Sequence, residues 1–165
     1  MSDDTQRLWP TVLLSLLAGL VLTLTPLPGW LQPWRPSWIA LVIIYWLIYE
    51  PRRVGMMTAW ISGLMLDTLR GVLLGQHALA LVVISFFALR FHLRIRVFPI
   101  GQQTATVFML IALHEFLLYW VDGVSGEPGG DWRRWLSVMS SAAVWPVVTL
   151  ILNRFRLENR HTGAV

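Results

Sequence analysis

Six hydrophobic runs separated by short links constrain this fold more than any other feature of the sequence. They cover residues 8–25, 37–49, 54–69, 74–91, 104–121 and 135–152. Most approach the roughly 20 residues that an α-helix needs to cross about 30 Å of hydrocarbon. Because 56% of the residues are hydrophobic and only 13% are charged, the links leave no room for a soluble domain. We therefore expect an all-α, polytopic integral membrane protein, with residues 1–165 forming one six-helix transmembrane domain.

The second run, residues 37–49, is too short to cross a bilayer unaided. Thirteen residues give about 20 Å of helix. Three explanations stay open: the helix is tilted in a thinned region, it is extended by the proline-rich approach 27–36, or it is a partial span packed inside protein. Because the link 50–53 is so short, we also expect the second and third helices to form an antiparallel hairpin.

The distribution of arginine predicts the orientation in the membrane. Six spans place both termini and the links 50–53 and 90–103 on one side, with nine of the thirteen basic residues, against four on the other side. Short cytoplasmic loops carry the excess of Lys and Arg in membrane proteins. We therefore expect both termini in the cytoplasm.

The sequence lacks the patterns typical of enzymes, metal sites and nucleic-acid-binding surfaces. Cysteine is absent, and so are the G-x-S-x-G, H-E-x-x-H and glycine-rich nucleotide motifs. His77, His92 and His114 are too dispersed to predict a metal site. The net charge of +4 is scattered rather than clustered on one face. We expect no enzymatic activity, no cofactor, no bound metal and no nucleic-acid partner.

Small residues gather at two places within the hydrophobic runs. They are Gly55, Ala59 and Gly63 on the third run, and Ser140, Ser141, Ala142 and Ala143 on the sixth. On a helix, small residues at such spacing allow another helix to approach closely. Packing within the bundle is the default interpretation. The alternative, which we keep as a hypothesis, is that one of these faces receives the transmembrane helix of a partner.

Three ionisable residues are expected inside the bundle, at Asp67, His114 and Glu115. A charged side chain in hydrocarbon is costly unless it is paired or hydrated. Asp67 lies about one turn before the end of its helix, where it can bond a nearby loop or pair with Arg70. His114 and Glu115 lie near the middle of the fifth run and about 100° apart around a helix, so we expect them to face different directions. An interhelical hydrogen bond, a proton relay and a partner contact stay open for them.

Basic residues mark the links on the predicted cytoplasmic side. They are Arg52 and Arg53 in the link 50–53, and Arg90, Arg94 and Arg96, which alternate with apolar residues in the link 90–103. Such arginines can reach anionic lipid headgroups. Lipid anchoring is the default interpretation, and docking of a cytoplasmic protein is the alternative.

Several short motifs also occur in a particular order. The string Arg35-Pro36-Ser37-Trp38 is followed by Tyr45-Trp46, by Pro51-Arg52-Arg53-Val54-Gly55, and then by Gly63, Asp67, Gly71 and Leu74-Gly75. In order and spacing, and over nearly the whole chain, this sequence resembles the rod shape-determining membrane proteins of the MreD family, in their proteobacterial form. One departure is the His114-Glu115 pair, where the resemblance leads us to expect a lone aspartate.

The resemblance implies a non-enzymatic subunit of the bacterial rod complex, or elongasome, in the inner membrane, where it helps to control cell shape and side-wall peptidoglycan synthesis. Members associate with MreC, a single-span protein, and through it with the actin-like MreB filament, the RodA glycosyltransferase and its penicillin-binding transpeptidase; a homo-oligomer is also compatible. The family is similar in fold to the six-helix substrate-binding subunits of energy-coupling-factor vitamin transporters. That likeness supplies the alternative function, a small-molecule-binding subunit of a membrane transporter.

Overall fold

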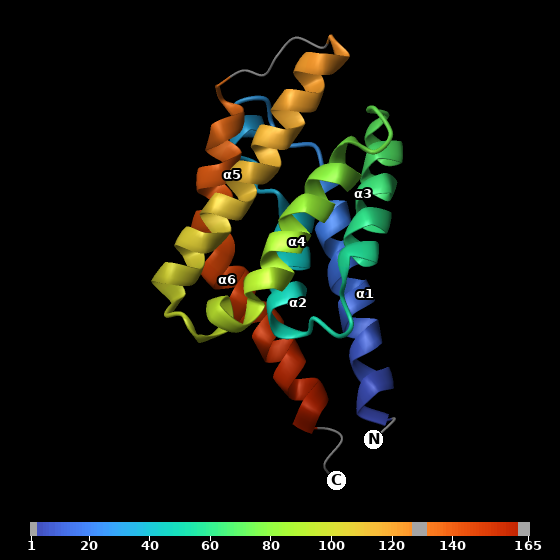
Figure 1. Ribbon diagram of the computed structural model, residues 1–165, viewed down its shortest axis with the longest axis vertical. Coiled ribbons are helices and arrows are strands. Elements are labelled where there is room, and N and C mark those ends of the chain that lie inside the picture. The colour runs from blue at the N-terminus through green and yellow to red at the C-terminus, as the bar shows by residue number, and fades with distance from the viewer. Residues whose placement is uncertain (1–2, 127–131, 162–165) are drawn as a thin grey trace.

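The computed structural model describes residues 3–126 and 132–161, with side chains from 9 to 126 and from 132 to 157, and this part of the chain forms six α-helices and no strand (Figure 1). The elements are α1 Asp3–Leu24, the short 3-10 turn η1 Gln32–Trp34, α2 Trp38–Tyr49, α3 Met56–Arg70, α4 Gln76–Val97, α5 Ile100–Ser125 and α6 Arg134–His161. The expected all-α fold is confirmed. The start of α1 and the end of α6 lie at the same end of the bundle (Figure 1).

Helix α2 is the centre of the bundle. Every residue from Ile39 to Ile48 is buried, and α1, α4, α5 and α6 all contact this helix. A helix that is hydrophobic all round belongs in such a position. Its 12 residues give about 18 Å of helix. Of the three explanations for the short second run, the structure therefore selects a partial span packed inside protein.

Two residues of the family-like motif tie α2 to its neighbours. Trp46 donates its indole Nε1–H to Ser15 Oγ of α1 at 2.8 Å. Tyr45 donates its hydroxyl to Asn153 Oδ1 of α6, also at 2.8 Å. Buried Trp and Tyr need a partner for their polar atom, so these two bonds fix how α2 is rotated between α1 and α6.

Helix α3 packs along α4 and not along α2, so the expected hairpin of the second and third helices is wrong. Gly63 shows how close the contact is, because a Cβ at this position would lie 2.3 Å from Ala78 Cα and 2.5 Å from Ala78 N. Ala59 is also fully buried, whereas Gly55 precedes the helix and has open space around it. Helix α4 therefore already occupies the Gly63 part of the small-residue face, and Ala59 is buried within the bundle, so neither residue is available to a partner's helix.

The link predicted at 90–103 is almost entirely helical. Helix α4 continues to Val97 and α5 begins at Ile100, with an extended Phe98 before Pro99. Because a proline disfavours the helical conformation of the residue before it, α4 ends here. The arginines of this segment therefore project from the last turns of α4, where positive charge suits the helix dipole.

Three helices of the described chain are long and apolar enough to cross a membrane by themselves: α4, α5 and the Arg134–Leu157 part of α6. The apolar part of α1, Trp9–Leu24, is shorter, and α3 has 15 residues. Large apolar side chains such as Leu14 and Leu150 are more than two-thirds exposed, as expected for surfaces that face lipid. The chain is thus a membrane helical bundle in which short and long helices are combined.

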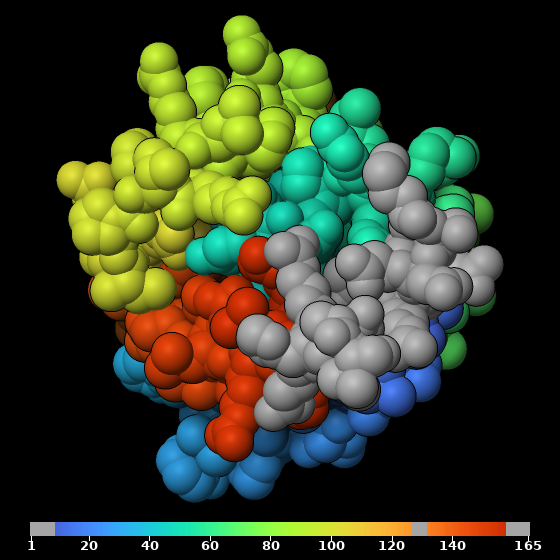
Figure 2. All heavy atoms as spheres, turned by 90° about the horizontal axis from the view of Figure 1, so that it is seen from below, coloured from blue at the N-terminus to red at the C-terminus, as the bar shows by residue number. Residues whose placement is uncertain are grey.

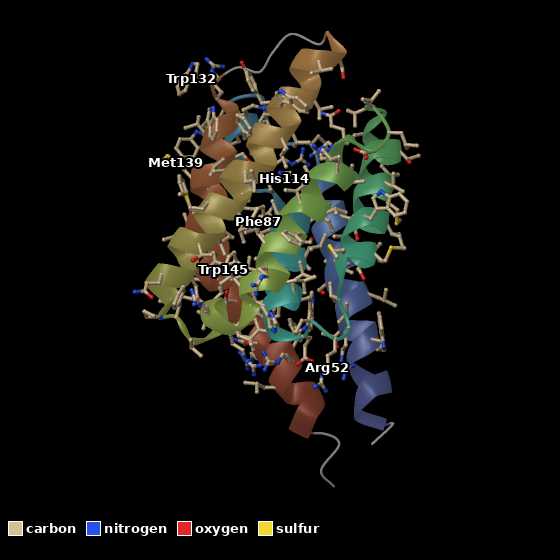
Figure 3. The ribbon with its side chains drawn as sticks, viewed as in Figure 1. Arg52, Phe87, His114, Trp132, Met139 and Trp145 are labelled. Atoms are coloured by element: carbon tan, nitrogen blue, oxygen red, sulfur yellow. The ribbon has the colours of Figure 1, made fainter. Side chains whose placement is uncertain are left out.

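The two ends of the bundle differ in chemistry. Figure 2 looks onto the end where α1 begins and α6 ends, and where the α2–α3 link and the α4–α5 turn lie beside α6. We call it the arginine end, because these elements hold Arg52, Arg53, Arg90, Arg94, Arg96, Arg154 and Arg156. The opposite end, where Trp132 lies in Figure 3, is called the tryptophan end; its exposed tryptophans are Trp30, Trp34, Trp120, Trp132 and Trp135.

Candidate functional site

A polar cavity of about 670 Å³ lies at the tryptophan end of the bundle. Its size falls within the range of ligand pockets, about 300–1,000 Å³. All six helices or the segments beside them contribute to its wall. The polar side chains that line it are Thr23, Gln32, Arg35, Ser37, Arg70, Gln76, His77, His114, Glu115, Asp122, Arg133, Arg134 and Ser137.

Asp67 is fully buried behind this wall and holds the α3–α4 turn. Its carboxylate accepts hydrogen bonds from the backbone N–H groups of Gly75 and His77, both at 2.9 Å, and of Ala78 at 3.4 Å. These N–H groups begin α4 and have no partner within the helix, and the negative charge suits the positive end of the helix dipole. Asp67 therefore bonds the nearby loop. The loop itself depends on two glycines of the motif, Gly71 and Gly75, with φ of 64° and 100°.

His77 connects Asp67 to Arg70. Its Nδ1 lies 2.7 Å from Asp67 Oδ1, and its Nε2 lies 3.0 Å from Arg70 Nη1. Because a guanidinium can only donate, Nε2 must accept, which places the ring proton on Nδ1. The structure thus shows Arg70 reaching Asp67 through His77, and Arg70 also donates to Thr23 O at 3.4 Å. This role of His77 could not be predicted from the sequence, since His77 follows Asp67 by ten residues and no motif links them.

Arg35 reaches back to the end of α1. Its Nη2 donates to Thr25 O at 2.5 Å and to Leu22 O at 3.3 Å. The last carbonyls of a helix lack intrahelical partners, and a cation suits this end of the dipole. The Arg35 Nε, however, is buried without a hydrogen-bond partner in the described part of the chain. Burial also lowers the pKa of its guanidinium from the usual value.

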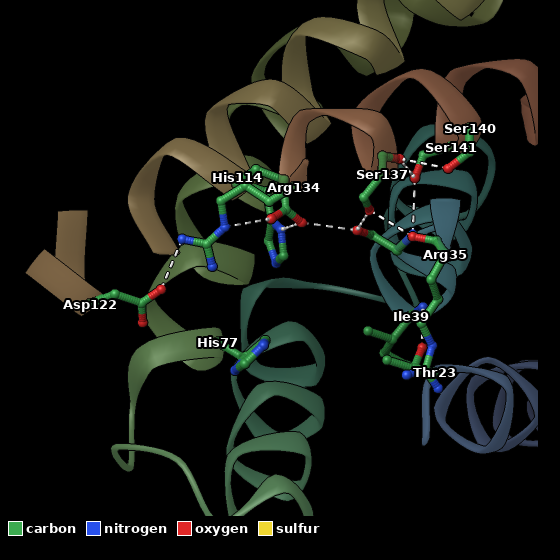
Figure 4. A network of polar contacts seen from close by, with 12 residues as sticks. Thr23, Arg35, Ile39, His77, His114, Asp122, Arg134, Ser137, Ser140 and Ser141 are labelled. Carbon is green, nitrogen blue, oxygen red and sulfur yellow. Dashed lines mark hydrogen bonds and ion pairs between the residues drawn. The ribbon is translucent and has the colours of Figure 1, made fainter. Parts of the chain in front are cut away.

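The first residues of α2 form another part of the cavity wall (Figure 4). Ser37, which precedes the helix and follows Pro36, donates its backbone N–H to Ser141 Oγ at 2.9 Å and its hydroxyl to Glu115 Oε1 at 3.1 Å. Ile39 donates its N–H to Thr23 Oγ1 of α1 at 3.3 Å. Side chains of α1, α5 and α6 therefore satisfy the start of α2, as a helix end inside a membrane protein requires.

The small-residue surface of α6 is largely occupied by this contact. Ser141 and Ala142 are buried, Ser140 is half-buried, and Ala143 is exposed. Because Ser141 binds the start of α2, only Ala143 and its lipid-facing neighbours stay available on this surface for the hypothesised helix of a partner.

His114 and Glu115 both lie in the cavity wall, contrary to the expectation that they face different directions. They are 3% and 8% exposed, and His114 Nδ1 lies 3.4 Å from Glu115 Oε1. The flexible Glu115 side chain bends back around α5 to reach both His114 and Ser37. Since α5 runs from Ile100 to Ser125, the pair lies close to the middle of this helix, as expected. Glu115 thus makes an interhelical hydrogen bond, whereas both ring nitrogens of His114 lack hydrogen-bond partners among the described residues.

Arg134 extends the polar network from α6 to α4. Its Nε lies 4.0 Å from Glu115 Oε2, and its Nη1 lies 2.8 Å from Asp122 Oδ2. The other oxygen of Asp122 accepts a hydrogen bond from the Gln76 side chain. Helices α4, α5 and α6 are therefore joined at one end by the charged side chains of Asp122 and Arg134 and the amide of Gln76. The acidic residues Glu127 and Asp131, between α5 and α6, lie outside the described residues.

The basic residues of the arginine end are not brought to this cavity. Arg156 is buried there, with its Nε 3.4 Å from Glu50 Oε1 and its guanidinium 5.0 Å from the Tyr49 ring. Arg53 lies 3.8 Å from Glu50. The remaining predicted contact residues of this end are exposed, namely Arg52, Arg90, Arg94 and Arg96.

Comparison with known proteins identifies the family of this bundle. The family model described as rod shape-determining protein MreD matches residues 5–155. The chain belongs to the MreD family. A curated relative, the rod shape-determining protein MreD of Haemophilus influenzae, is 28% identical over 148 residues, covering 90% of this chain and 91% of that protein. No solved structure matches, so the expected likeness to energy-coupling-factor transporter subunits stays a prediction.

Membership of the MreD family confirms the resemblance read from the order of the motifs, and it supports a rod shape-determining role. The matched residues include every element that lines the cavity. In this MreD-family chain, Arg35, Asp67, Gly71 and Gly75 stabilise helix ends and turns at the tryptophan end. These motif residues therefore have structural roles that explain their spacing.

Proposed function

We propose that this chain is a non-enzymatic scaffold subunit of a bacterial rod complex, or elongasome, and that it binds the transmembrane helix of an MreC-like single-span protein. It lies in the inner membrane with both termini in the cytoplasm. Through its partner it acts with an MreB-like filament, a RodA-type glycosyltransferase and a penicillin-binding transpeptidase in side-wall peptidoglycan synthesis. Family membership supports the shape-determining part, and an apolar groove on the side of the bundle supports the binding of a helix.

This groove has a volume of about 390 Å³ and runs between α1 and α6, with α2 beneath it. It is lined by Pro10, Thr11, Leu14, Ser15, Ala18, Gly19 and Leu22 of α1, Trp38 and Val42 of α2, and Val148, Ile151, Leu152 and Phe155 of α6. Ser15, one of its two polar residues with Thr11, already bonds Trp46 and the backbone of α1. The groove therefore offers an almost wholly apolar surface.

The shape of the groove suits another helix. Leu14, Ala18 and Leu22 recur at four-residue spacing and so share one face of α1. Leu14 and Leu22 are 72% and 46% exposed, with the exposed Ala18 between them as a notch. Within a bilayer, close packing rather than hydrophobicity holds helices together. A notch between large side chains gives a partner's helix such a contact.

Ala18→Trp tests the proposal, because the indole would fill the groove without entering the core. We expect the partner to co-purify from membranes of the native bacterium at less than one-tenth of the wild-type amount. Ala105→Trp makes the same change on an exposed position of α5 and should leave co-purification unchanged. Undiminished co-purification with Ala18→Trp would contradict docking in the groove; loss with Ala143→Trp instead would place the partner on the other small-residue surface.

The proposed orientation can be tested directly, because the chain contains no cysteine. Arg94→Cys places one thiol at the arginine end, and Trp132→Cys places one at the tryptophan end. In cells with a permeabilised outer membrane, a membrane-impermeant maleimide should label the Trp132→Cys protein, and it should label the Arg94→Cys protein only after lysis. The opposite pattern would reverse the assigned orientation.

The exposed arginines of α4 are the proposed contact with anionic lipid or with the cytoplasmic filament. Arg90, Arg94 and Arg96 all project from its last two turns. Replacing all three with glutamine should weaken membrane retention or filament localisation. Unchanged behaviour in both assays would remove this part of the proposal.

A second candidate function, a small-molecule-binding subunit of a transporter, is favoured by the size and polarity of the cavity. The two candidates differ in the phenotype of depletion from the native bacterium. Loss of rod shape is the outcome expected for the scaffold. Normal shape combined with a vitamin requirement would favour the transport subunit.

A further inference from the structure

We propose that the cavity at the tryptophan end binds a phosphate group, carried by a lipid headgroup or by a soluble molecule. The first observation is His114, which lines the cavity and is 3% exposed; its Nδ1 lies 3.4 Å from Glu115 Oε1, and its Nε2 has no hydrogen-bond partner in the described chain. The Arg35 Nε in the same wall is likewise unpartnered. Buried polar atoms without partners are rare because each costs free energy. A ligand with several oxygen atoms would satisfy both groups.

The charge of the cavity wall determines whether that ligand is an anion or a cation. Four arginines line the cavity, against the two carboxylates of Glu115 and Asp122. Both carboxylates already have partners, Ser37 for Glu115 and Arg134 for Asp122. Asp67 lies outside the lining, and its carboxylate accepts hydrogen bonds from the N–H groups that begin α4. The cavity therefore carries an excess of positive charge.

Two helix N-termini add to this positive potential. Helices α2 and α6 both begin at the cavity, and neither has an acidic residue in its first turn. The N-terminal turn of a helix presents N–H donors and the positive end of the dipole, which together favour an anion. The start of α4 provides the contrast, since Asp67 already occupies it. At the start of α2 the N–H groups of Ser37 and Ile39 bind Ser141 and Thr23, and Glu115 accepts only the Ser37 hydroxyl. This helix therefore adds the positive end of its dipole to the cavity.

The arrangement of donors favours phosphate over a carboxylate. Arg35 precedes α2, His114 lies on α5, and Arg134 begins α6, so they approach the cavity from three directions. A phosphate offers oxygen atoms on several sides, whereas a carboxylate offers two on one side. The His114 ring extends from α5 toward His77 of α4, with ring centroids 6.3 Å apart (Figure 4). The exposed tryptophans around this end mark the level of lipid headgroups.

Thermal unfolding of the full-length protein in dodecyl maltoside tests the proposal, using glycerol 3-phosphate as the soluble probe and phosphatidic acid as the lipid probe. A ligand that binds only the folded protein raises the unfolding midpoint in a saturable manner. We expect this for at least one probe, with affinity at least tenfold weaker in His114→Phe and in Arg134→Gln. Arg94→Gln removes an equal charge from the exposed arginine end and should bind as the wild type does.

The outcomes separate the two sources of phosphate. Stabilisation by phosphatidic acid alone assigns the site to a lipid headgroup, and stabilisation by glycerol 3-phosphate assigns it to soluble phosphate. The proposal is wrong if neither probe stabilises the wild-type protein, or if His114→Phe and Arg94→Gln bind equally well. If Arg134→Gln fails to fold, His114→Phe decides alone, since His114 makes no hydrogen bond in the described chain and this variant loses only the 3.4 Å contact with Glu115.

Discussion

Replacing Gly63 with alanine should destabilise this protein more than so small a change suggests. The new Cβ would lie 2.3 Å from Ala78 Cα and 2.5 Å from Ala78 N, well inside the 3.4 Å at which ordinary contact begins. Both atoms belong to the backbone of α4, so no side-chain rotation can relieve the overlap. Helices α3 and α4 must therefore separate locally by about 1 Å.

The separation would also weaken the hydrogen bonds of Asp67. Its contacts with the N–H groups of Gly75 and His77 are 2.9 Å long, and a further 1 Å would take them beyond hydrogen-bond range. Overpacking costs about 1–3 kcal/mol, and loss of a buried hydrogen bond costs about 1–3 kcal/mol. The better helix propensity of alanine returns at most about 1 kcal/mol. We expect the free energy of unfolding to fall by about 2–4 kcal/mol.

The assay is reversible unfolding in mixed detergent and SDS micelles, followed by tryptophan fluorescence. Gly101→Ala is the matched control, because Gly101 also lies in a helix and a Cβ there would meet no atom within 4 Å. It should leave stability unchanged or raise it by up to about 1 kcal/mol. Equal stability of the Gly63→Ala and Gly101→Ala proteins would refute the close-packing argument. A larger residue at Gly63 would also disturb the fold, so it cannot test partner binding.

Other buried polar residues allow further tests in the same unfolding assay. Asp67→Asn should lower the free energy of unfolding by about 2–3 kcal/mol, because an amide NH₂ cannot accept the hydrogen bonds that the carboxylate accepts from backbone N–H groups. Wild-type stability of this variant would contradict the capping role of Asp67. His77→Phe should lower the free energy of unfolding by about 2–3 kcal/mol, because His77 has hydrogen-bond partners. His114→Phe should stay within about 1 kcal/mol of wild type, because the His114 ring makes no hydrogen bond in the described chain. Similar losses of stability in the two variants would contradict this difference between the histidines. Ser15→Ala should lower the free energy of unfolding by about 1–2 kcal/mol, because it leaves the Trp46 N–H without its partner. A red-shifted indole emission would indicate that water has entered the site. Unchanged emission and stability would show that this hydrogen bond contributes little.

The candidate site was only partly predictable from the sequence. Asp67, His114 and Glu115 stood out because ionisable residues are rare in hydrophobic runs. Their partners did not stand out, because residues far apart in the chain supply them. Ser37 and Ser141, for example, are separated by 104 positions and joined by one hydrogen bond. The direction of the Glu115 side chain also depended on Ser37, which no helical periodicity of α5 could indicate.

The sequence by itself determined that the chain is helical, that it belongs in a membrane, and which family it resembles. Long apolar runs and ordered short motifs carry that information locally. Only the tertiary structure decided that α2 is the buried centre, that α3 packs on α4, and that a polar cavity forms at one end. The physical reason is that lipid and protein interior are equally apolar, so leucine at position 14 is 72% exposed while leucine at position 41 is fully buried. In such a chain hydrophobicity marks the helices, and shape and hydrogen bonding determine how they pack together.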